Sequence, residues 1–189
     1  MMLTASILKG NRISLTPLED HHIEGMHDYS SNPLFFQYID LSPHHEISDT
    51  RAYFHELKKR EQERNGIYWA IINNDDHRMI GSFGLVDIDE LIGQGQIGYG
   101  LNPEFWGRGL FKEALVLCLD FAFKQLKLIK IIVTTSIANE ASIRGLQSCG
   151  FKSVAILREF YNIRGVPEDG VQLVLTLQQW EIEALTSKH

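Results

Sequence analysis

The residues best suited to chemistry lie in one short segment, 105–112, which reads Phe-Trp-Gly-Arg-Gly-Leu-Phe-Lys. Its two glycines, Gly107 and Gly109, precede a stretch with helical periodicity, so we expect the segment to open a helix. Backbone N–H groups at a helix N-terminus have no intrahelical partners, and the helix dipole adds positive potential there. Glycine lets such groups approach an anion closely, and Arg108 and Lys112 add positive charge at the same end. The segment therefore predicts a diphosphate site, with a plain glycine turn from strand to helix as the alternative.

A second glycine run, 93–98, formally matches the dinucleotide fingerprint G-x-G-x-x-G. That fingerprint needs a preceding strand, a following helix and an acidic residue about 20 positions further on, at a strand end. Here the run leads into a strand, and Asp120 falls inside a predicted helix, so the pattern does not favour a dinucleotide-binding fold. The sequence also contains no G-K-[ST], which excludes a P-loop.

Hydrophobic periodicity predicts an α/β (α+β) protein in which strands come first and later alternate with helices. We expect strands at 12–18, 67–72, 79–87, 95–101, 129–135, 151–158 and 171–177, and helices at 19–29, 48–64, 109–124 and 140–148. Ser48 is the expected cap of the second helix. This order implies one mixed sheet with helices on its faces. Because no repeat or Pro/Gly/Ser-rich linker divides the chain, we expect residues 1–189 to form a single domain.

Composition places the chain among ordinary globular proteins, with 44% hydrophobic and 22% charged residues. A net charge of −6 argues against a nucleic-acid partner and weakly suits a cationic one, such as an amine. We find no signal peptide and no apolar window near the roughly 20 residues that a membrane span needs, so we expect no membrane contact and a cytoplasmic protein. Cys118 and Cys149 lack partners at metal-ligand spacing, and the histidines show no zinc pattern, so we expect no metal.

The glycine segment is part of a longer run that resembles a known family. Residues 97–103, followed by 106–114, resemble the acetyl-CoA signature of GNAT acetyltransferases, in particular the RimJ/RimL-like branch of ribosomal-protein N-terminal acetyltransferases. A second block, 139–143 with its continuation at 149–151, resembles the N-x-x-S…G-F segment of that branch. The opening segment 12–18 fits as well, and the order of elements agrees over nearly the whole chain.

The resemblance implies a GNAT-like domain with a mixed, mostly antiparallel sheet in which two parallel strands, 95–101 and 129–135, splay apart. Acetyl-CoA would lie in the resulting cleft, with its pantetheine arm on main-chain groups around residue 99–101 and its pyrophosphate on the N–H groups of 107–112. The implied cofactor-binding residues are Tyr99, Gly100, Leu101, Trp106, Gly107, Arg108, Gly109, Leu110, Phe111, Lys112, Asn139 and Ser142. Structural alternatives remain: Tyr99 as a strand aromatic, Trp106 as a core anchor and Asn139 as a helix cap.

Three positions depart from the family pattern. Phe111 stands where Gly or Ala is usual, which predicts a more crowded pyrophosphate turn. Gln96 stands where many relatives carry a Glu that acts as base, and Leu146 where many carry a Tyr that acts as general acid. The commonest acid–base pair of the family is therefore absent.

Other residues are then needed for proton transfer. The resemblance implies Ser142 as the donor to the thiolate leaving group or as a water-holder, because it matches the serine of the N-x-x-S segment; bonding to its own backbone is the alternative. Glu159 and Tyr161 are secondary catalytic candidates. No cysteine is suitably activated, so we expect direct acetyl transfer within a ternary complex.

The absence of a strong protein base affects which class of amine the protein could acetylate. An α-amino group is roughly one-seventh neutral at pH 7, whereas a lysine amine is neutral only about once in 2,500. An α-amine can therefore attack with less help, which favours a protein N-terminus, of the ribosomal-protein type that the resemblance implies. The alternatives are a small-molecule amine (a polyamine, an aminoglycoside or an amino-acid-like compound) and a non-catalytic acyl-CoA-binding module. The sequence leaves open whether protomers pair as a homodimer.

Overall fold

The computed structural model describes residues 4–186, whose strands form one eight-stranded mixed sheet. The strands are β1 (Leu8–Lys9), β2 (Ile13–Pro17), β3 (Gly66–Asn73), β4 (Met79–Asp89), β5 (Gln94–Leu101), β6 (Lys130–Ser136), β7 (Lys152–Ile163) and β8 (Val166–Thr176). They lie in the order β1-β2-β3-β4-β5-β6-β8-β7. Neighbouring strands pair antiparallel except β5 and β6, which pair parallel. This confirms the predicted fold class.

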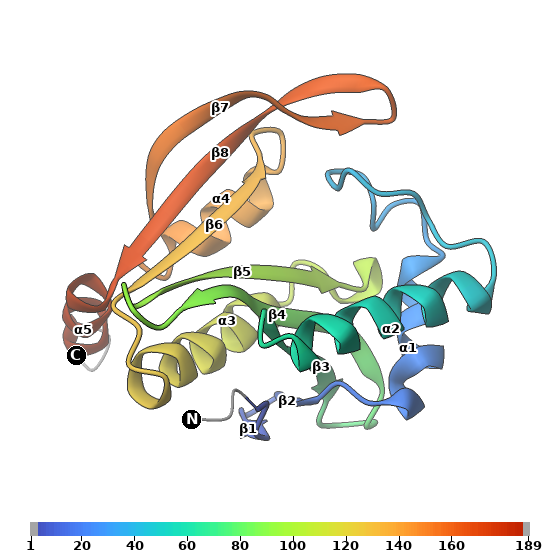
Figure 1. Ribbon diagram of the computed structural model, residues 1–189, viewed down its shortest axis with the longest axis horizontal. Helices are drawn as coiled ribbons and strands as arrows, with labels where there is room; N and C mark the ends of the chain where they lie inside the picture. Colours follow the sequence, from blue (N-terminus) through green and yellow to red (C-terminus); the bar gives the residue numbers. More distant parts are fainter. Residues whose placement is uncertain (1–3, 187–189) are drawn as a thin grey trace.

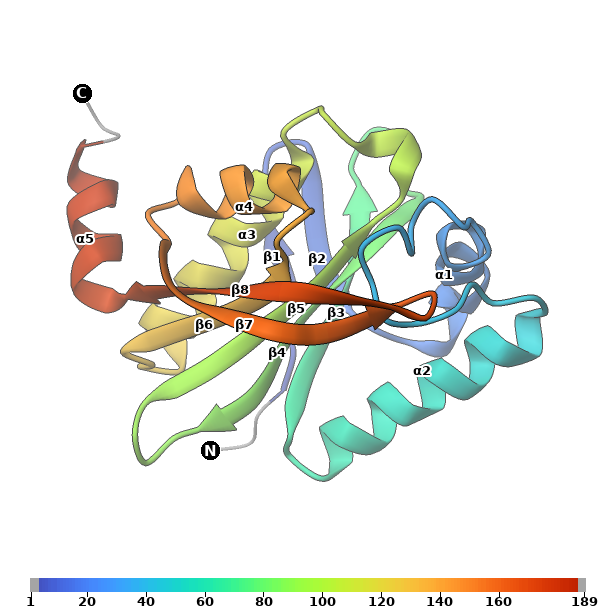
Figure 2. The same ribbon diagram turned by 90° about the horizontal axis from the view of Figure 1, so that it is seen from above.

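Helices cover both faces of this sheet. The α-helices are α1 (Ile23–Ser30), α2 (Ile47–Gln62), α3 (Leu110–Asp120), α4 (Glu140–Gln147) and α5 (Leu177–Thr186), with a π-helical turn, Phe121–Gln125, directly after α3. Helices α1 and α2 lie on one face, and α3 and α4 on the other (Figure 2). Among residues 4–186 no helix is long and apolar enough to cross a membrane.

The sheet buries both of its faces, which gives the protein two hydrophobic cores. On β3 successive side chains point to opposite faces, so Trp69 packs in the larger core under α3 while Tyr68 joins the smaller core under α1 and α2. Leu115 of α3 is fully buried in the first core, and Phe54 of α2 is buried in the second. The continuous burial of β3 explains why the predicted strand 67–72 reads as an unbroken apolar run.

The main difference from the sequence-based prediction is the length of the last two strands. β7 and β8 extend past the predicted limits of 158 and 171 to a two-residue turn, Arg164-Gly165, where both residues have positive φ (55° and 82°). The hairpin arches over β5 toward the loop between α1 and α2 (Figure 1). Its tip contacts that loop, where the N–H of Asn162 donates to Asp40 Oδ2 at 3.2 Å.

The start of α2 also differs from the prediction. Glu46, rather than Ser48, is the capping residue, because its side chain accepts from the backbone of the first turn while Asp49 accepts from the N–H groups of His45 and Glu46. This reciprocal arrangement is a capping box. The capping box sets the start of α2, and therefore also the end of the loop that faces the hairpin tip.

Candidate functional site

The parallel pair β5–β6 opens after three residue pairs. Gln94 pairs with Lys130, Gly95 with Ile131 and Gln96 with Ile132, and beyond these the two strands diverge. The remainder of β5 still pairs with β4, and the remainder of β6 with β8. The inner edges of both strands therefore present peptide groups without a ladder partner, on either side of a slot. An extended ligand with amide groups can bind such an edge as an added strand.

Trp106 follows β5, beyond the part of the strand that has left β6. Its indole Nε1 donates to the carbonyl of Leu101 at 2.7 Å, and the residue is 41% exposed. The ring therefore lies at the surface, where it holds the end of β5 against the following turn, and it is not a core anchor. The turn itself starts at Asn102, whose side chain accepts from Glu104 N and caps the short 3-10 helix Pro103–Phe105.

The glycine turn that follows has the geometry of an anion site. Gly107 and Gly109 both lie in the left-handed region, with φ of 71° and 75°, where glycine is the favoured residue. A Cβ at Gly107 would meet no atom within 4 Å, so the space in front of the turn is open. Glu113 N is bonded to the carbonyl of Gly109, while the N–H groups of the preceding three residues have no acceptor within the helix.

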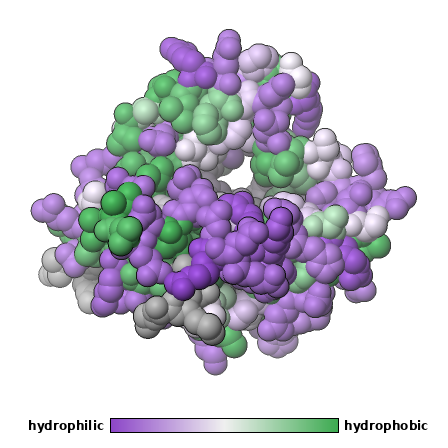
Figure 3. Space-filling model, viewed as in Figure 1, coloured by the Kyte–Doolittle hydropathy of each residue, from purple (hydrophilic) through white to green (hydrophobic). Residues whose placement is uncertain are grey.

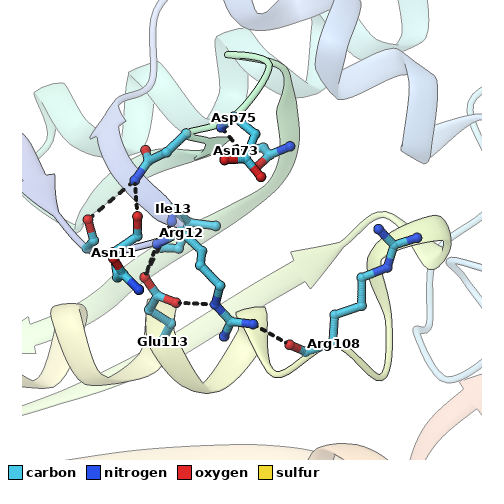
Figure 4. Close-up of polar contacts among 9 residues, drawn as sticks. Asn11, Arg12, Ile13, Asn73, Asp75, Arg108 and Glu113 are labelled. Carbon is cyan, nitrogen blue, oxygen red and sulfur yellow. Dashed lines mark hydrogen bonds and ion pairs between the residues drawn. The ribbon is translucent and has the colours of Figure 1, made fainter.

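Arg12 braces this turn from behind, a role that sequence reasoning missed (Figure 4). Its Nη1 donates to the carbonyl of Arg108 at 2.8 Å, and its Nε contacts Glu113 Oε2 at 3.0 Å. A trans peptide points its C=O and its N–H in opposite directions. Because the Arg108 carbonyl is held toward Arg12, the N–H of Gly109 points away, toward the open side of the turn.

A pair of hydroxyls, one from β5 and one from α4, lies beside the slot. The phenol of Tyr99 on β5 and the hydroxyl of Ser142 on α4 hydrogen-bond to each other across the slot. Asn139 caps α4 by accepting from Ser142 N at 3.2 Å, which confirms the capping role for this residue. Burial raises the pKa of Tyr99 well above its ordinary value, although the Ser142 hydrogen bond opposes the shift. Tyr99 is therefore a neutral proton donor at neutral pH.

Phe111 does not crowd the glycine turn. Its ring lies 4.4 Å from that of Tyr99 and packs so closely on α4 that a Cβ at Gly145 would come within 2.9 Å of it. The bulky residue at this position thus fills the gap between α3 and α4. It also supports the Tyr99 ring, which stacks on Phe83 from the other side at 5.7 Å.

The remaining predicted residues are less closely associated with the hydroxyl pair. Burial raises the pKa of Tyr161 to about 12, and its phenol is near enough to Tyr99 to raise that residue's pKa further. Glu159 is exposed on β7 and makes no hydrogen bond to Tyr99 or Ser142. The guanidinium of Arg108 lies 5.2 Å over the Phe105 ring, and Lys112 Nζ donates to the carbonyl of Ser148 at 3.3 Å. Both side chains are therefore held by contacts within the protein.

Sequence reasoning also missed a pocket on the α1/α2 face of β4 and β5, with a volume of about 240 Å³. Its aromatic walls are formed by Tyr29, Phe35, Phe36, Tyr53 and Tyr68. Gly98, Tyr99 and Gly100 line it as well, so the pocket reaches the edge of the slot. In the space-filling view an opening passes beneath the hairpin arch, above β5 (Figure 3). The arrangement provides two connected spaces, one for an extended ligand with a charged end and one for an apolar group.

Comparison with known proteins matches most of the chain to one family. A family model described as "Acetyltransferase (GNAT) domain" matches residues 12–152. The probable N-acetyltransferase YjcK of Bacillus subtilis is 30% identical over 168 residues, which span 86% of this chain and 93% of that protein.

Two acetyltransferases of known structure are among the proteins that share this fold. Spermidine N-acetyltransferase from Vibrio cholerae, in complex with CoA and spermine, has a TM-score of 0.80, with 19% identity and coverage of 91% of this chain and 99% of that one. Ribosomal-protein-S5-alanine acetyltransferase from Vibrio fischeri has a TM-score of 0.81, with 18% identity and coverage of 93% and 99%. The fold is equally close to both, so overall similarity does not distinguish the two kinds of acceptor.

Proposed function

The chain belongs to the GNAT family of N-acetyltransferases, and on that premise we propose that it binds acetyl-CoA between β5 and β6 and acetylates an α-amine. The observation that carries the proposal is the continuity of the slot with the glycine turn: unpaired strand edges lead directly to a row of unpaired helix N–H groups. The first suits the amides of pantetheine, and the second suits a diphosphate. We further propose that residues 1–189 act as one domain and that the protein is cytoplasmic.

In this proposal each predicted cofactor residue acts mainly through its main chain. The peptide groups of Tyr99, Gly100 and Leu101 hold the pantetheine arm, and those of residues 107–112 hold the diphosphate. Trp106 orients the end of β5, and Asn139 acts by fixing the start of α4 beside the arm. This division is supported by the side-chain contacts described above, because the side chains of Trp106, Lys112 and Asn139 already bond to the protein itself.

The transfer step follows from the position of the two hydroxyls. The neutral amine attacks the thioester carbonyl, the C–N bond forms, and a backbone N–H of β5 stabilises the negative oxygen. The C–S bond then breaks, and the amine releases its extra proton to water. Ser142 donates a proton to the departing thiolate and takes one from Tyr99 through their hydrogen bond as it does so, and Tyr99 regains its proton from water, so that the proton lost by the amine is balanced by the one gained by the thiol. Tyr161 acts on this pair only indirectly, and we assign no role to Glu159.

Because the substrate amine must be neutral to attack the thioester, the rate of the reaction should depend on pH. For an α-amine substrate, kcat/KM should rise with pH because the neutral form is the nucleophile, and it should level near the amine pKa of about 8. For a lysine-like amine the rise should continue to about pH 10. Initial rates of CoA release measured from pH 6 to 10 check this. A plateau far below the amine pKa would instead indicate a protein group that limits the rate.

The identity of the products tests the function itself. We expect mass spectrometry to find N-acetylated products when the protein is incubated with labelled acetyl-CoA and short peptides with free N-termini, and peptides with blocked N-termini should stay unmodified. If lysine side chains or polyamines are modified instead, the α-amine part of the proposal is wrong.

A small-molecule amine is the second candidate, and one contact favours it. The bond between Asn162 N and Asp40 Oδ2 joins the hairpin tip to the loop above the pocket. This contact narrows the entrance, which suits a compact acceptor better than a folded protein. A peptide N-terminus of a few residues is compatible with both candidates.

The brace behind the glycine turn gives a further prediction. Arg12→Met should weaken acetyl-CoA binding roughly tenfold, because losing the charged hydrogen bond to the Arg108 carbonyl frees the turn to reorient. Isothermal titration calorimetry measures the effect. Arg78→Met is the matched control, since Arg78 forms a weak ion pair with Asp28 at 3.9 Å on the other face. Equal affinities for the two variants would remove the assigned role of Arg12.

A further inference from the structure

Gly98 of β5 is a glycine that neither the packing nor the backbone of the strand requires. A Cβ at this position would meet no atom within 4 Å, and its φ lies outside the left-handed region. It pairs in regular register with Gly84, so it does not form a bulge. Glycine weakens a strand, and one that serves neither a bulge nor a bend marks a place where a ligand or another backbone comes close. Gly98 therefore indicates a point of close approach by a ligand.

Gly98 faces the side of the sheet on which α1 and α2 lie. At its partner Gly84 a Cβ would come within 2.9 Å of the Tyr68 ring, which belongs to the smaller core, and paired residues point to the same face. The next residue along β5, Tyr99, packs on the larger core under α3. In the proposed function the cofactor fills the α3/α4 side of the slot, where the glycine turn and Ser142 lie. The attacking amine must therefore arrive from the opposite side, which is the side of Gly98.

Phe35 covers the neighbouring position on this face of β5. Gly100 is the next residue that points to the same side, and a Cβ there would overlap the Phe35 ring. That ring contacts the rings of Tyr29 and Phe36, each at a centroid distance of 4.9 Å, so it is held in place. On the part of β5 that has left β6, Gly98 is exposed and Gly100 is buried. The open stretch of the strand is therefore short, and Phe35 forms its boundary.

We propose that the acetyl acceptor reaches the thioester over Gly98, and that Phe35 sets the width of this passage and so the bulk tolerated beside the amine. This inference rests on the proposed transferase function. The missing side chain of Gly98 leaves room for the carbon atom that carries the amine. Both residues act by shape, and neither takes part in proton transfer.

Gly98→Ala tests the passage with a single methyl group. CoA release is measured with Ala-Gly-Gly, Val-Gly-Gly and spermidine, and kcat/KM should fall at least about tenfold for each amine that wild type acetylates, mainly through a higher KM. The Kd for acetyl-CoA should stay unchanged, because the methyl group points away from α3 and α4. The melting temperature should equal or exceed that of wild type, since the methyl group meets no other atom. Gln94→Ala is the control and should change none of these, because Gln94 faces the same side where β5 still pairs with β6.

Phe35→Ala tests the boundary of the passage. It should raise kcat/KM for Val-Gly-Gly relative to that for Ala-Gly-Gly by about tenfold, because the branched side chain gains the space of the ring. Combined with Gly98→Ala, it should restore most of the kcat/KM that the alanine at position 98 removes, whichever amine is acetylated, because the displaced acceptor gains the same space. Leu34→Ala is the matched control and should change neither quantity, since Leu34 is the preceding loop residue and is 48% exposed.

The outcomes separate the inference from the function on which it rests. Unchanged kcat/KM in Gly98→Ala overturns the passage and leaves the transferase function intact. A lowered melting temperature or a raised Kd for acetyl-CoA in that variant assigns Gly98 to the fold or to the cofactor site, and also overturns the passage. No recovery of kcat/KM in the double variant overturns the role of Phe35. Acetyl-CoA binding without turnover of any amine overturns the proposed function, and the inference with it.

Discussion

Valine at position 109 is expected to weaken acetyl-CoA binding at least about 100-fold. The left-handed backbone of Gly109, with φ of 75°, resists a β-branched residue, and a Cβ there would lie 3.5 Å from Arg12 Nη2, so valine would also push against the arginine that holds the turn. Loss of the turn removes several charge-assisted hydrogen bonds to the diphosphate at once, each worth about 1.5–3 kcal/mol. Titration calorimetry with acetyl-CoA measures the loss directly.

Backbone strain alone must be separated from loss of the site. Gly165→Val is the matched control, because Gly165 has a φ of 82°, lies at the hairpin tip and has no atom within 4 Å of a Cβ. Both variants should lower the melting temperature by similar amounts, and only Gly109→Val should lose the cofactor. If Gly109→Val binds acetyl-CoA like Gly165→Val, the glycine turn is not the diphosphate site.

The second large effect concerns the hydroxyl pair across the slot. Tyr99→Phe and Ser142→Ala should each lower kcat roughly 10²-fold, which is at the low end of what a positioned acid contributes. The Kd for acetyl-CoA should change little, because the proposed cofactor contacts here are with the main chain. Ser148→Ala, at the C-terminal cap of α4, is the control, since its hydroxyl donates to the carbonyl of Gly145 at 2.8 Å.

The double variant gives the sharper test. If the proton reaches the thiolate by way of both hydroxyls, Tyr99→Phe combined with Ser142→Ala should be little slower than either single variant. Independent contributions would multiply instead, to a loss of roughly 10⁴-fold. Multiplying effects, or a single variant with normal kcat, would contradict a shared proton route through Tyr99 and Ser142.

Local sequence predicted those parts of the site that are continuous in the chain. The glycine turn at 107–112, the strand before it and the helix after it are neighbours in sequence, so periodicity and glycine spacing were sufficient to predict them. The splayed pair came from the family resemblance, because no local pattern indicates where two distant strands stop pairing.

Parts of the site that depend on long-range contacts could not be read from the sequence. Arg12 bonds to Arg108 across 96 positions, and Tyr99 bonds to Ser142 across 43. Contacts between residues so far apart in the sequence produce no pattern in residue spacing. Phe35 comes from a loop without periodicity, yet its contact with Gly100 shapes the pocket on the α1/α2 face of β4 and β5. The tip of the β7–β8 hairpin was missed because residues 158–170 are rich in charged residues and Gly and also contain Pro, which strand propensities disfavour.

Backbone hydrogen exchange tests the central claim most directly, because the claim concerns main-chain N–H groups. Saturating acetyl-CoA should slow exchange in segments 98–101 and 107–112, and should leave helix α2, which packs on the opposite face of the sheet from α3, unchanged. Binding of acetyl-CoA with no protection in the two segments would contradict the account, whatever the affinity measured.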